Sequence, residues 1–457
     1  MNATMNADKD ATRYVAGNLG PVDKELTLDE SRLTVTGTLP PQLSGRYLRI
    51  GPNPAQPIDP DKHHWFIGDG MVHGVRLDAG RATWYRNRYT RTPSTSAALG
   101  EAPLTHAIRE GRPTTVANTN VIGHAGRTFA IVEAGGAPCE LTYELDTIGC
   151  TDFDGTLPAA FSAHPKRDPA TNRLHTVGYH WAQGPMVQYI VMDPSAAIEF
   201  VQDIEIPSGA NPMMHELSIT ATRAVLYDLP CVFDIDSAMN GVRLPYRWKP
   251  ELGARVGLLP LNGGDVIWCD LDEPCYVFHS YTAFDGPDGQ VIMDCVVHPR
   301  MFHSDVHGPD EGIPTTQRWT IDPNTRTVKR EPLHDVPSEF PRVDERLVGR
   351  QARYGLSVGI GKGWDHGPLV RTDFVTGAVQ TISHGPGRGT METVFIPRTD
   401  QSAEDDGWLM SMVHDANTQQ TDLVLLDAGE PSSAPVATVH IPARVPYGFH
   451  GNWVPDL

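Results

Sequence analysis

The sequence predicts an all-β protein built as a β-propeller, and three observations support this fold class. Short runs of alternating apolar and polar residues follow one another from about residue 33 onward, with lengths typical of strands. Glycine and proline are frequent, at 43 and 39 of 457 residues, which leaves little room for long helices. Similar turn segments recur between the strands, as they do in propeller blades.

The strand-like runs carry the β-branched and aromatic side chains that strands favour. Five of them begin at Arg127, Val187, Arg223, Trp408 and Asp422. The clearest hairpin joins residues 276–284 to residues 290–298 through a short glycine-containing turn. Gly286 and Gly289 are expected to supply the permissive backbone that this turn needs.

The recurring turn segments each follow one predicted strand and precede the next, and each begins with an aspartate. They start at Asp146, Asp168, Asp193, Asp322 and Asp373. Aspartate favours turn initiation, so each segment is expected to form the tip of an outer hairpin. Such turns are also common in other all-β proteins, although a single sandwich rarely needs so many strands.

One domain is predicted, because no linker or low-complexity segment divides the chain after its first residues. Residues 1–20 are polar and are expected to form a flexible N-terminus. Residues 21–457 are expected to form a single β-propeller domain.

Charge and cysteine content exclude several classes of function. The chain carries 37 Lys and Arg against 56 Asp and Glu, a net charge of −19, so nucleic acid would be repelled rather than bound. Six cysteines are too few for a disulfide scaffold, and none forms the CxxC pair of a zinc or iron–sulfur site. No secretory signal or apolar run of membrane-spanning length is found, so a cytoplasmic location is expected.

Four of the 19 histidines stand out because their surroundings are mostly apolar, where an unpaired imidazole is costly to bury. They are His164, His215, His279 and His450. The intervals between them correspond to one blade or a multiple of one blade, so strands of different blades could carry them to one point. Four neutral imidazoles at one point would suit a divalent transition metal.

The contexts of these histidines, with other motifs in order, resemble the carotenoid cleavage oxygenase family. That family includes apocarotenoid oxygenases, lignostilbene dioxygenases and the vertebrate retinoid isomerohydrolase. The resemblance runs from about Leu39 to the C-terminus. It is carried by the segments 45–54, 64–77, 162–169, 214–220, 274–279, 338–344 and 448–453.

The resemblance implies a seven-bladed propeller capped by loops and short helices, with one Fe(II) per chain on the central axis. His164, His215, His279 and His450 would hold the iron and leave open positions for dioxygen. Glu133, Glu339 and Glu392 would support His215, His279 and His450 respectively. A carboxylate that accepts the distal N–H of a ligand histidine fixes its tautomer and raises its basicity.

A second group of histidines lies close together in a Pro- and Gly-rich loop. His298, His303 and His307 are expected to be surface residues rather than a second metal site.

The family reaction is oxidative cleavage of an alkene by dioxygen to give two carbonyl products. The iron supplies the chemistry, so no catalytic residue is expected beyond the iron site. A metal-free binding scaffold and an isomerase that needs no dioxygen are alternatives. The first is disfavoured by the four intact histidine contexts, and dioxygen consumption would distinguish the second.

The expected substrate is an apolar carotenoid or apocarotenoid, and the alternative is a stilbene or phenylpropenoid cleaved to an aromatic aldehyde. Lignostilbene-cleaving relatives bind a phenol with a lysine directly before the first supporting glutamate, where this chain has Val132. Valine can donate nothing to a phenol, so a long polyene fits better. Val132 and Phe66 are expected to line the substrate tunnel near the iron.

A polyene substrate resides in membranes, so a weak peripheral membrane contact is expected. The candidate segment is 229–248, with Phe233, Leu244, Tyr246 and Trp248. Its acidic residues and the net charge of −19 both weaken attachment to anionic lipid.

Overall fold

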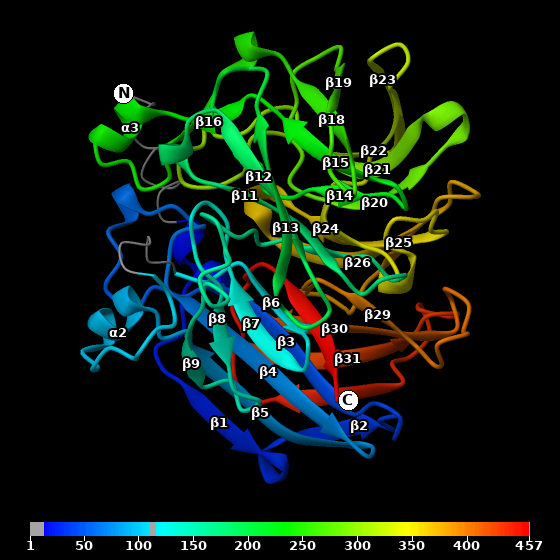
Figure 1. Cartoon of the computed structure of the whole chain (residues 1–457). Coiled ribbons are helices and arrows are strands. Elements are labelled where there is room, and N and C mark those ends of the chain that lie inside the picture. The colour runs from blue at the N-terminus through cyan, green and yellow to red at the C-terminus, as the bar shows by residue number, and fades with distance from the viewer. Residues whose placement is uncertain (1–12, 110–115, 457) are drawn as a thin grey trace, which may run out of the picture.

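The computed structural model describes residues 13–109 and 116–456, and almost every regular element in them is a strand (Figure 1). The α-helices of this part are two short ones, α2 (Pro93–Leu99) and α3 (Ile235–Met239). The sheets are arranged around a common centre as in a propeller, which confirms the predicted all-β class.

The first sheet combines strands from the beginning of the chain with the C-terminal strand. Its order is β1 (Leu26–Asp29), β5 (Arg81–Tyr89), β4 (Gly70–Asp78), β3 (Gly45–Pro52) and β33 (Gly451–Pro455). A six-stranded sheet also joins distant parts of the chain. It consists of β2 (Thr34–Gly37), β32 (Ala437–Ile441), β31 (Gln420–Asp427), β30 (Gly407–Asp415) and β28 (Arg388–Thr390), with β29 (Val394–Pro397) beside β30. Strands from both ends of the chain therefore close the ring of sheets.

Three four-stranded sheets are antiparallel meanders. The first consists of β6 (Asn120–His124), β7 (Arg127–Ile131), β8 (Cys139–Leu141) and β9 (Thr147–Cys150). The second consists of β10 (Lys166–Arg167), β11 (Leu174–Tyr179), β12 (Met186–Met192) and β13 (Ile198–Glu205). The third consists of β24 (Ser338–Arg342), β25 (Tyr354–Ile360), β26 (His366–Asp373) and β27 (Val379–Ile382). Each meander buries apolar side chains against its neighbours.

The largest sheet has eight strands. Its order is β14 (Ser218–Ile219), β15 (Arg223–Asp228), β18 (Arg255–Pro260), β19 (Ile267–Asp270), β23 (Thr327–His334), β22 (Thr315–Asp322), β21 (Val291–Val297) and β20 (Ser280–Asp285). A small ribbon of β16 (Cys231–Phe233) and β17 (Tyr246–Trp248) is inserted between β15 and β18, and its connection contains α3.

The five predicted turn segments all connect neighbouring antiparallel strands. Asp168, Asp193, Asp322 and Asp373 each accept a backbone N–H two residues further on, which is the turn chemistry that favours aspartate. The Asp168 turn joins β10 to β11, at the start of its meander rather than in the outer pair.

The predicted hairpin is β20 and β21, with Phe284 opposite Ile292. Its turn uses positive φ at Asp288 and Gly289. Gly286 has a φ of −96°, so the expectation that it supplies special backbone freedom was wrong.

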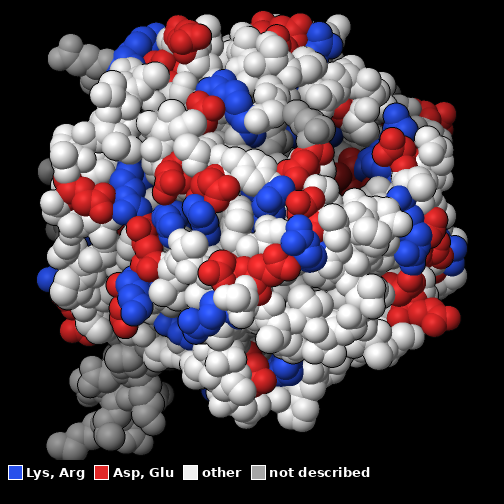
Figure 2. Space-filling model, turned by 90° about the horizontal axis from the view of Figure 1, so that it is seen from below, with Lys and Arg blue, Asp and Glu red and all other residues white. Residues whose placement is uncertain are grey.

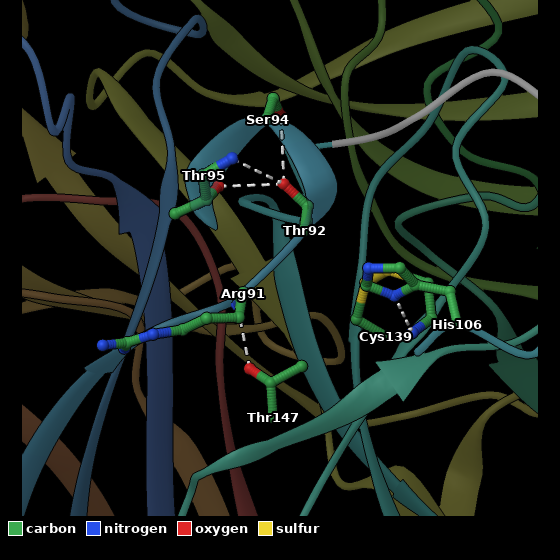
Figure 3. The surroundings of a disulfide bond; sticks show 8 residues. Arg91, Thr92, Ser94, Thr95, His106, Cys139 and Thr147 are labelled. Atoms are coloured by element: carbon green, nitrogen blue, oxygen red, sulfur yellow. Dashed lines mark hydrogen bonds between the residues drawn. A yellow bond between two sulfur atoms is a disulfide. The ribbon is translucent and has the colours of Figure 1, made fainter. Parts of the chain in front are cut away.

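One disulfide is present in the described residues, between Cys139 of β8 and Cys150 of β9 (Figure 3). The two cysteines are directly opposite in the ladder, so the bridge joins strands that already pair. The backbone N–H of Cys150 also donates to His106 Nδ1 at 3.1 Å. The other four cysteines are free and buried, as expected for a chain without a disulfide scaffold.

The predicted flexible N-terminus needs correction from residue 13 onward, while residues 1–12 lie outside the described part. Tyr14 is only 1% exposed, and its ring stacks on Trp65 at 5.9 Å between centroids. Its hydroxyl donates to Asp305, and Arg13 forms an ion pair with the same carboxylate. The sequence around Tyr14 is polar, so this burial depends on partners that are distant in the chain.

The expected membrane segment is partly buried. Tyr246 is 6% exposed and belongs to the core, so its assignment to an exposed patch was wrong. Ile235 and Met239 of α3 are 54% and 80% exposed. None of the helices in the described ranges has the length and apolarity of a membrane span. On the face shown in Figure 2, basic and acidic side chains are intermixed.

Replacing Tyr14 with alanine should lower the free energy of unfolding by about 3–5 kcal/mol, because a buried aromatic ring is lost. Tyr14→Phe keeps the ring and should cost less, about 1–2 kcal/mol, because only the hydroxyl that donates to Asp305 and accepts from Arg13 is lost. Denaturant titration of both variants measures the difference. Equal stability of Tyr14→Ala and the wild type would show that residues 13–20 are not anchored.

Candidate metal centre

The four predicted histidines meet at one point because each lies just before a strand at the edge of its sheet. His279 and His450 directly precede β20 and β33, and His164 and His215 lie shortly before β10 and β14. Their ligand nitrogens all lie within 4.8 Å of one another, and all four side chains are buried. The structure therefore brings together residues that span most of the chain.

The closest approaches are between Nε2 atoms. His215 Nε2 lies 2.9 Å from His164 Nε2 and 3.1 Å from His279 Nε2. The ring of His450 is 4.2 Å from that of His164 between centroids. The Nε2 edges of the rings therefore face a common centre.

Each predicted glutamate contacts its predicted histidine at the opposite ring nitrogen. Glu133 Oε2 lies 2.7 Å from His215 Nδ1, and Glu339 Oε2 lies 2.7 Å from His279 Nδ1. Glu392 Oε1 lies 2.9 Å from His450 Nδ1. A carboxylate can only accept here, so Nδ1 carries the proton and Nε2 presents a lone pair to the centre.

This donor set fits a divalent cation. Lone pairs of neutral imidazoles that face one another at about 3 Å cannot hydrogen-bond, and burial excludes the water that would otherwise separate them. A transition metal accepts all of these lone pairs at once. Elsewhere in the described ranges, no other group of three or more His, Cys, Asp or Glu side chains is arranged in this way.

The electrostatics of the cluster differ between its imidazoles: burial dominates at His164 and His450, whereas at His279 burial is outweighed by Glu339, which raises the pKa of that imidazole. Burial, followed by the charge of its neighbours His450 and His215, holds the pKa of His164 well below its usual range. Burial lowers the pKa of His450 to about 4, and Glu392 only partly opposes it. Burial works against ionisation of Glu392, but His450 and Arg342 outweigh it and lower the pKa of Glu392 to about 2.

A second layer of residues holds two of the three glutamates. His298 Nε2 lies 3.0 Å from Glu339 Oε1, and the ring of His298 is stacked on Trp364. Arg342 Nη1 lies 3.2 Å from Glu392 Oε2, which also accepts the N–H of Gly451 at 2.7 Å. These contacts hold the carboxylate oxygens of Glu339 and Glu392 that do not face the ligand histidines.

The expectation that His298 is a surface residue was therefore wrong, since it is 1% exposed and bonded to Glu339. His303 is exposed as expected, and His307 is half-buried with Nδ1 near the His63 carbonyl. The Pro- and Gly-rich sequence around His298 resembles a surface loop, and its partner Glu339 is distant in the chain. Only its position directly after the apolar strand β21 indicated burial.

Glu216 is a further buried carboxylate that sequence reasoning missed. Its Oε1 accepts both the backbone N–H and the hydroxyl of Ser280 at 2.6 Å. Its Oε2 accepts from Lys166 at 3.0 Å and lies 4.0 Å from His164 Nδ1. Glu216 thereby links the segments that carry His164, His215 and His279. Its position next to His215 was the available signal.

An apolar cavity of about 270 Å³ lies against the histidine cluster. Phe66 and Val132, the two predicted tunnel residues, both line it. Its other aromatic lining residues are Trp65, Tyr179, Tyr246, Phe278, Phe340, Trp364 and Phe449. His215, His279 and His450 are among its lining residues, so the cavity lies against the histidine cluster.

A second cavity of about 610 Å³, whose lining mixes charged, polar and apolar side chains, lies against the same cluster through His164, His279 and His450. Its lining includes Lys166, Glu216, Ser280, Arg342 and Asn452. Since His279 and His450 line both cavities, the histidine cluster lies between them.

Comparison with known proteins identifies relatives over the whole length. A model of the retinal pigment epithelial membrane protein family matches residues 19–455. The carotenoid cleavage oxygenase of Mycobacterium tuberculosis is 43% identical over 99% of both chains.

Solved structures of relatives share the fold. The lignostilbene dioxygenase of Pseudomonas brassicacearum has a TM-score of 0.87 at 29% identity, over 97% of this chain and 99% of that one. The cobalt-substituted apocarotenoid oxygenase of Synechocystis has a TM-score of 0.85 at 25% identity, over 98% and 99%.

His298→Ala should weaken metal binding by up to about 10-fold, because Glu339 loses the contact that fixes its second oxygen. Metal affinity is measured by titration of the metal-depleted protein. His303→Ala is the matched control from the same loop, and its exposed side chain should leave affinity unchanged. Equal affinities of the two variants would remove His298 from the support of the centre.

Proposed function

Because the chain belongs to the carotenoid cleavage oxygenase family and is therefore an oxygenase, we propose that it is an Fe(II)-dependent dioxygenase. Its reaction is cleavage of one carbon–carbon double bond of a carotenoid or apocarotenoid by O2, which gives two carbonyl products. The observation that carries this proposal is the buried four-imidazole cluster that opens onto an apolar, aromatic cavity.

In this proposal His164, His215, His279 and His450 hold one iron per chain. Bound ferrous iron would supply the activation of dioxygen that cleavage of an alkene requires. Glu133, Glu339 and Glu392 orient three of the imidazoles and keep their Nε2 atoms unprotonated. No titratable acid or base of the protein is assigned to the reaction.

The apolar cavity aligns the double bond and excludes water from it. Phe66 and Phe278 contact each other edge to face at 5.8 Å, and Phe66 contacts Phe449 in the same way at 5.4 Å. Burial of a polyene against these rings gains the hydrophobic contribution of its whole length. Val132 adds an apolar side chain next to Glu133, which supports a polyene over a phenol that needs a charged partner.

In this proposal the propeller has seven blades. The eight-stranded sheet is held together between β19 and β23 by one residue pair, Asp270 with Thr327, so it divides into two blades of four strands. The β16–β17 ribbon is then an insertion. The four histidines and three glutamates are then divided among the seven blades, one residue to each blade. This arrangement is the one expected for a metal on the propeller axis.

The location proposed for the protein is the cytoplasm, with a weak peripheral contact to membranes. Ile235 and Met239 of α3 project at the surface, and Trp181 nearby is 50% exposed and stacks on Phe233 at 5.6 Å. Leu244 and Tyr246 of the same insertion line the apolar cavity, so a substrate taken from a bilayer would enter beside this patch.

Alanine at any one of His164, His215, His279 or His450 should abolish alkene cleavage and lower the iron content, since each removes one of four ligands. His175→Ala removes a buried histidine outside the cluster and should retain iron. Iron is quantified in purified protein, and O2 consumption is followed with an apocarotenal. Full iron and activity in one of the four variants would exclude that residue from the centre.

Val132→Lys should raise turnover of hydroxystilbene and lower turnover of an apocarotenal, each by roughly 10-fold or more, because a cation then lines the apolar cavity. Val132→Leu is the control that keeps the wall apolar. A wild-type protein that already prefers hydroxystilbene would contradict the proposed substrate class.

A further inference from the structure

His164 differs from the other three histidines of the candidate centre at its distal nitrogen. The Nδ1 atoms of His215, His279 and His450 each lie 2.7–2.9 Å from a glutamate oxygen. For His164 Nδ1, the nearest carboxylate oxygen in the described residues is Glu216 Oε2 at 4.0 Å, which is too far for a direct hydrogen bond. A ligand histidine normally donates its distal N–H to a carboxylate, a carbonyl or water, so an acceptor is expected here too.

The second cavity, of about 610 Å³, reaches both partners of this contact. His164 and Glu216 line it together, and His164 belongs to this cavity rather than to the apolar one. Lys166 and Ser280 are part of the same lining. A buried water molecule needs two to four polar partners, and this part of the cavity wall supplies them.

Glu216 is held firmly enough to orient another group. Its side chain is 1% exposed, and both of its oxygens are bonded. Oε1 accepts the backbone N–H and the hydroxyl of Ser280, each at 2.6 Å, and Oε2 accepts from Lys166 at 3.0 Å. A carboxylate oxygen can accept more than one hydrogen bond, so Oε2 has a further lone pair for a donor in the cavity.

A row of hydroxyls fixes the other side of this carboxylate. Because Ser280 gives its only hydroxyl proton to Glu216, its oxygen must accept the proton of Ser218, at 2.6 Å. Ser218 in turn accepts from the hydroxyl of Tyr227, also at 2.6 Å. All three protons therefore point toward Glu216, as expected around a carboxylate whose position matters.

We propose that Glu216 is a positioning residue for His164 and acts through one water molecule in the second cavity. The water accepts the Nδ1–H of His164 and donates to Oε2 of Glu216, across a separation that is too long for direct contact. His164 then has the same tautomer as the other three histidines, with its Nε2 lone pair toward the centre. The inference rests on the metal centre of the proposed function and does not depend on the substrate.

The competing role for Glu216 is to neutralise Lys166 and nothing more. The two roles differ in what happens when both residues are changed. If Glu216 serves only Lys166, the double variant Lys166→Met/Glu216→Gln removes the unpaired charge and restores the centre. If Glu216 serves His164, the double variant stays as impaired as Glu216→Gln alone.

The first measurement is the affinity for Co(II), titrated into the metal-depleted protein. Glu216→Gln should weaken binding roughly 10- to 100-fold, the usual cost of losing a residue that orients a metal ligand. The double variant should show the same loss. Asp456→Asn is the matched control, because Asp456 lines the same cavity but bonds the hydroxyl of Tyr143, and its affinity should equal that of the wild type.

The second measurement is proton NMR of the Co(II)-loaded protein, in which the paramagnetic ion shifts the N–H signal of each ligand imidazole. Four exchangeable signals are expected. Glu→Gln substitutions at Glu133, Glu339 and Glu392 each assign one, and the remaining signal belongs to His164. That signal should exchange with solvent fastest, since its acceptor is water, and it alone should move in Glu216→Gln.

Three results would overturn the proposal: a His164 signal that is unchanged in Glu216→Gln, one that exchanges as slowly as the other three, or a double variant with wild-type affinity. Should Glu216→Gln fail to fold because Lys166 loses its partner, the double variant makes the same comparisons. A wild type that binds no Co(II) would overturn the proposed centre itself. Four signals that respond as expected, without O2-dependent cleavage of any alkene, would overturn only the proposed function.

Discussion

The hydrogen bonds that three histidines donate to three glutamates are the interaction on which the rest of the structure depends. Each one places the imidazole proton on Nδ1 and turns the Nε2 lone pair toward a single buried point. Without a cation, those lone pairs would repel one another in a site from which water is excluded. The fold must therefore hold seven side chains from distant parts of the chain to within a fraction of an ångström, and a ring of sheets closed by both ends of the chain provides that rigidity.

The layers around the centre have separate roles that follow from their chemistry. His298 and Arg342 fix two of the carboxylates from behind, and Glu216 ties together the segments of three histidines. Glu133 lies on the wall of the apolar cavity as well as beside His215. The buried N-terminal segment supports this wall from outside, because Tyr14 stacks on Trp65.

Much of the centre could be predicted from the sequence, because His164, His215, His279 and His450 occur in apolar contexts that an unpaired imidazole does not tolerate. The glutamates were found through the family resemblance, and the structure places each beside its expected histidine. His298 and Tyr14 were missed for one physical reason. Their local sequences are ordinary for a loop and a polar terminus, and their burial depends on partners, Glu339 and Asp305, that are distant in the chain.

The central claim, that four imidazoles and no other side chains bind one iron, is tested most directly by X-ray absorption at the iron edge of the purified protein. We expect one iron per chain, with a first shell of nitrogen and oxygen only and outer-shell scattering from four imidazole rings. A shell that contains sulfur, or one with scattering from fewer than four imidazoles, would contradict it.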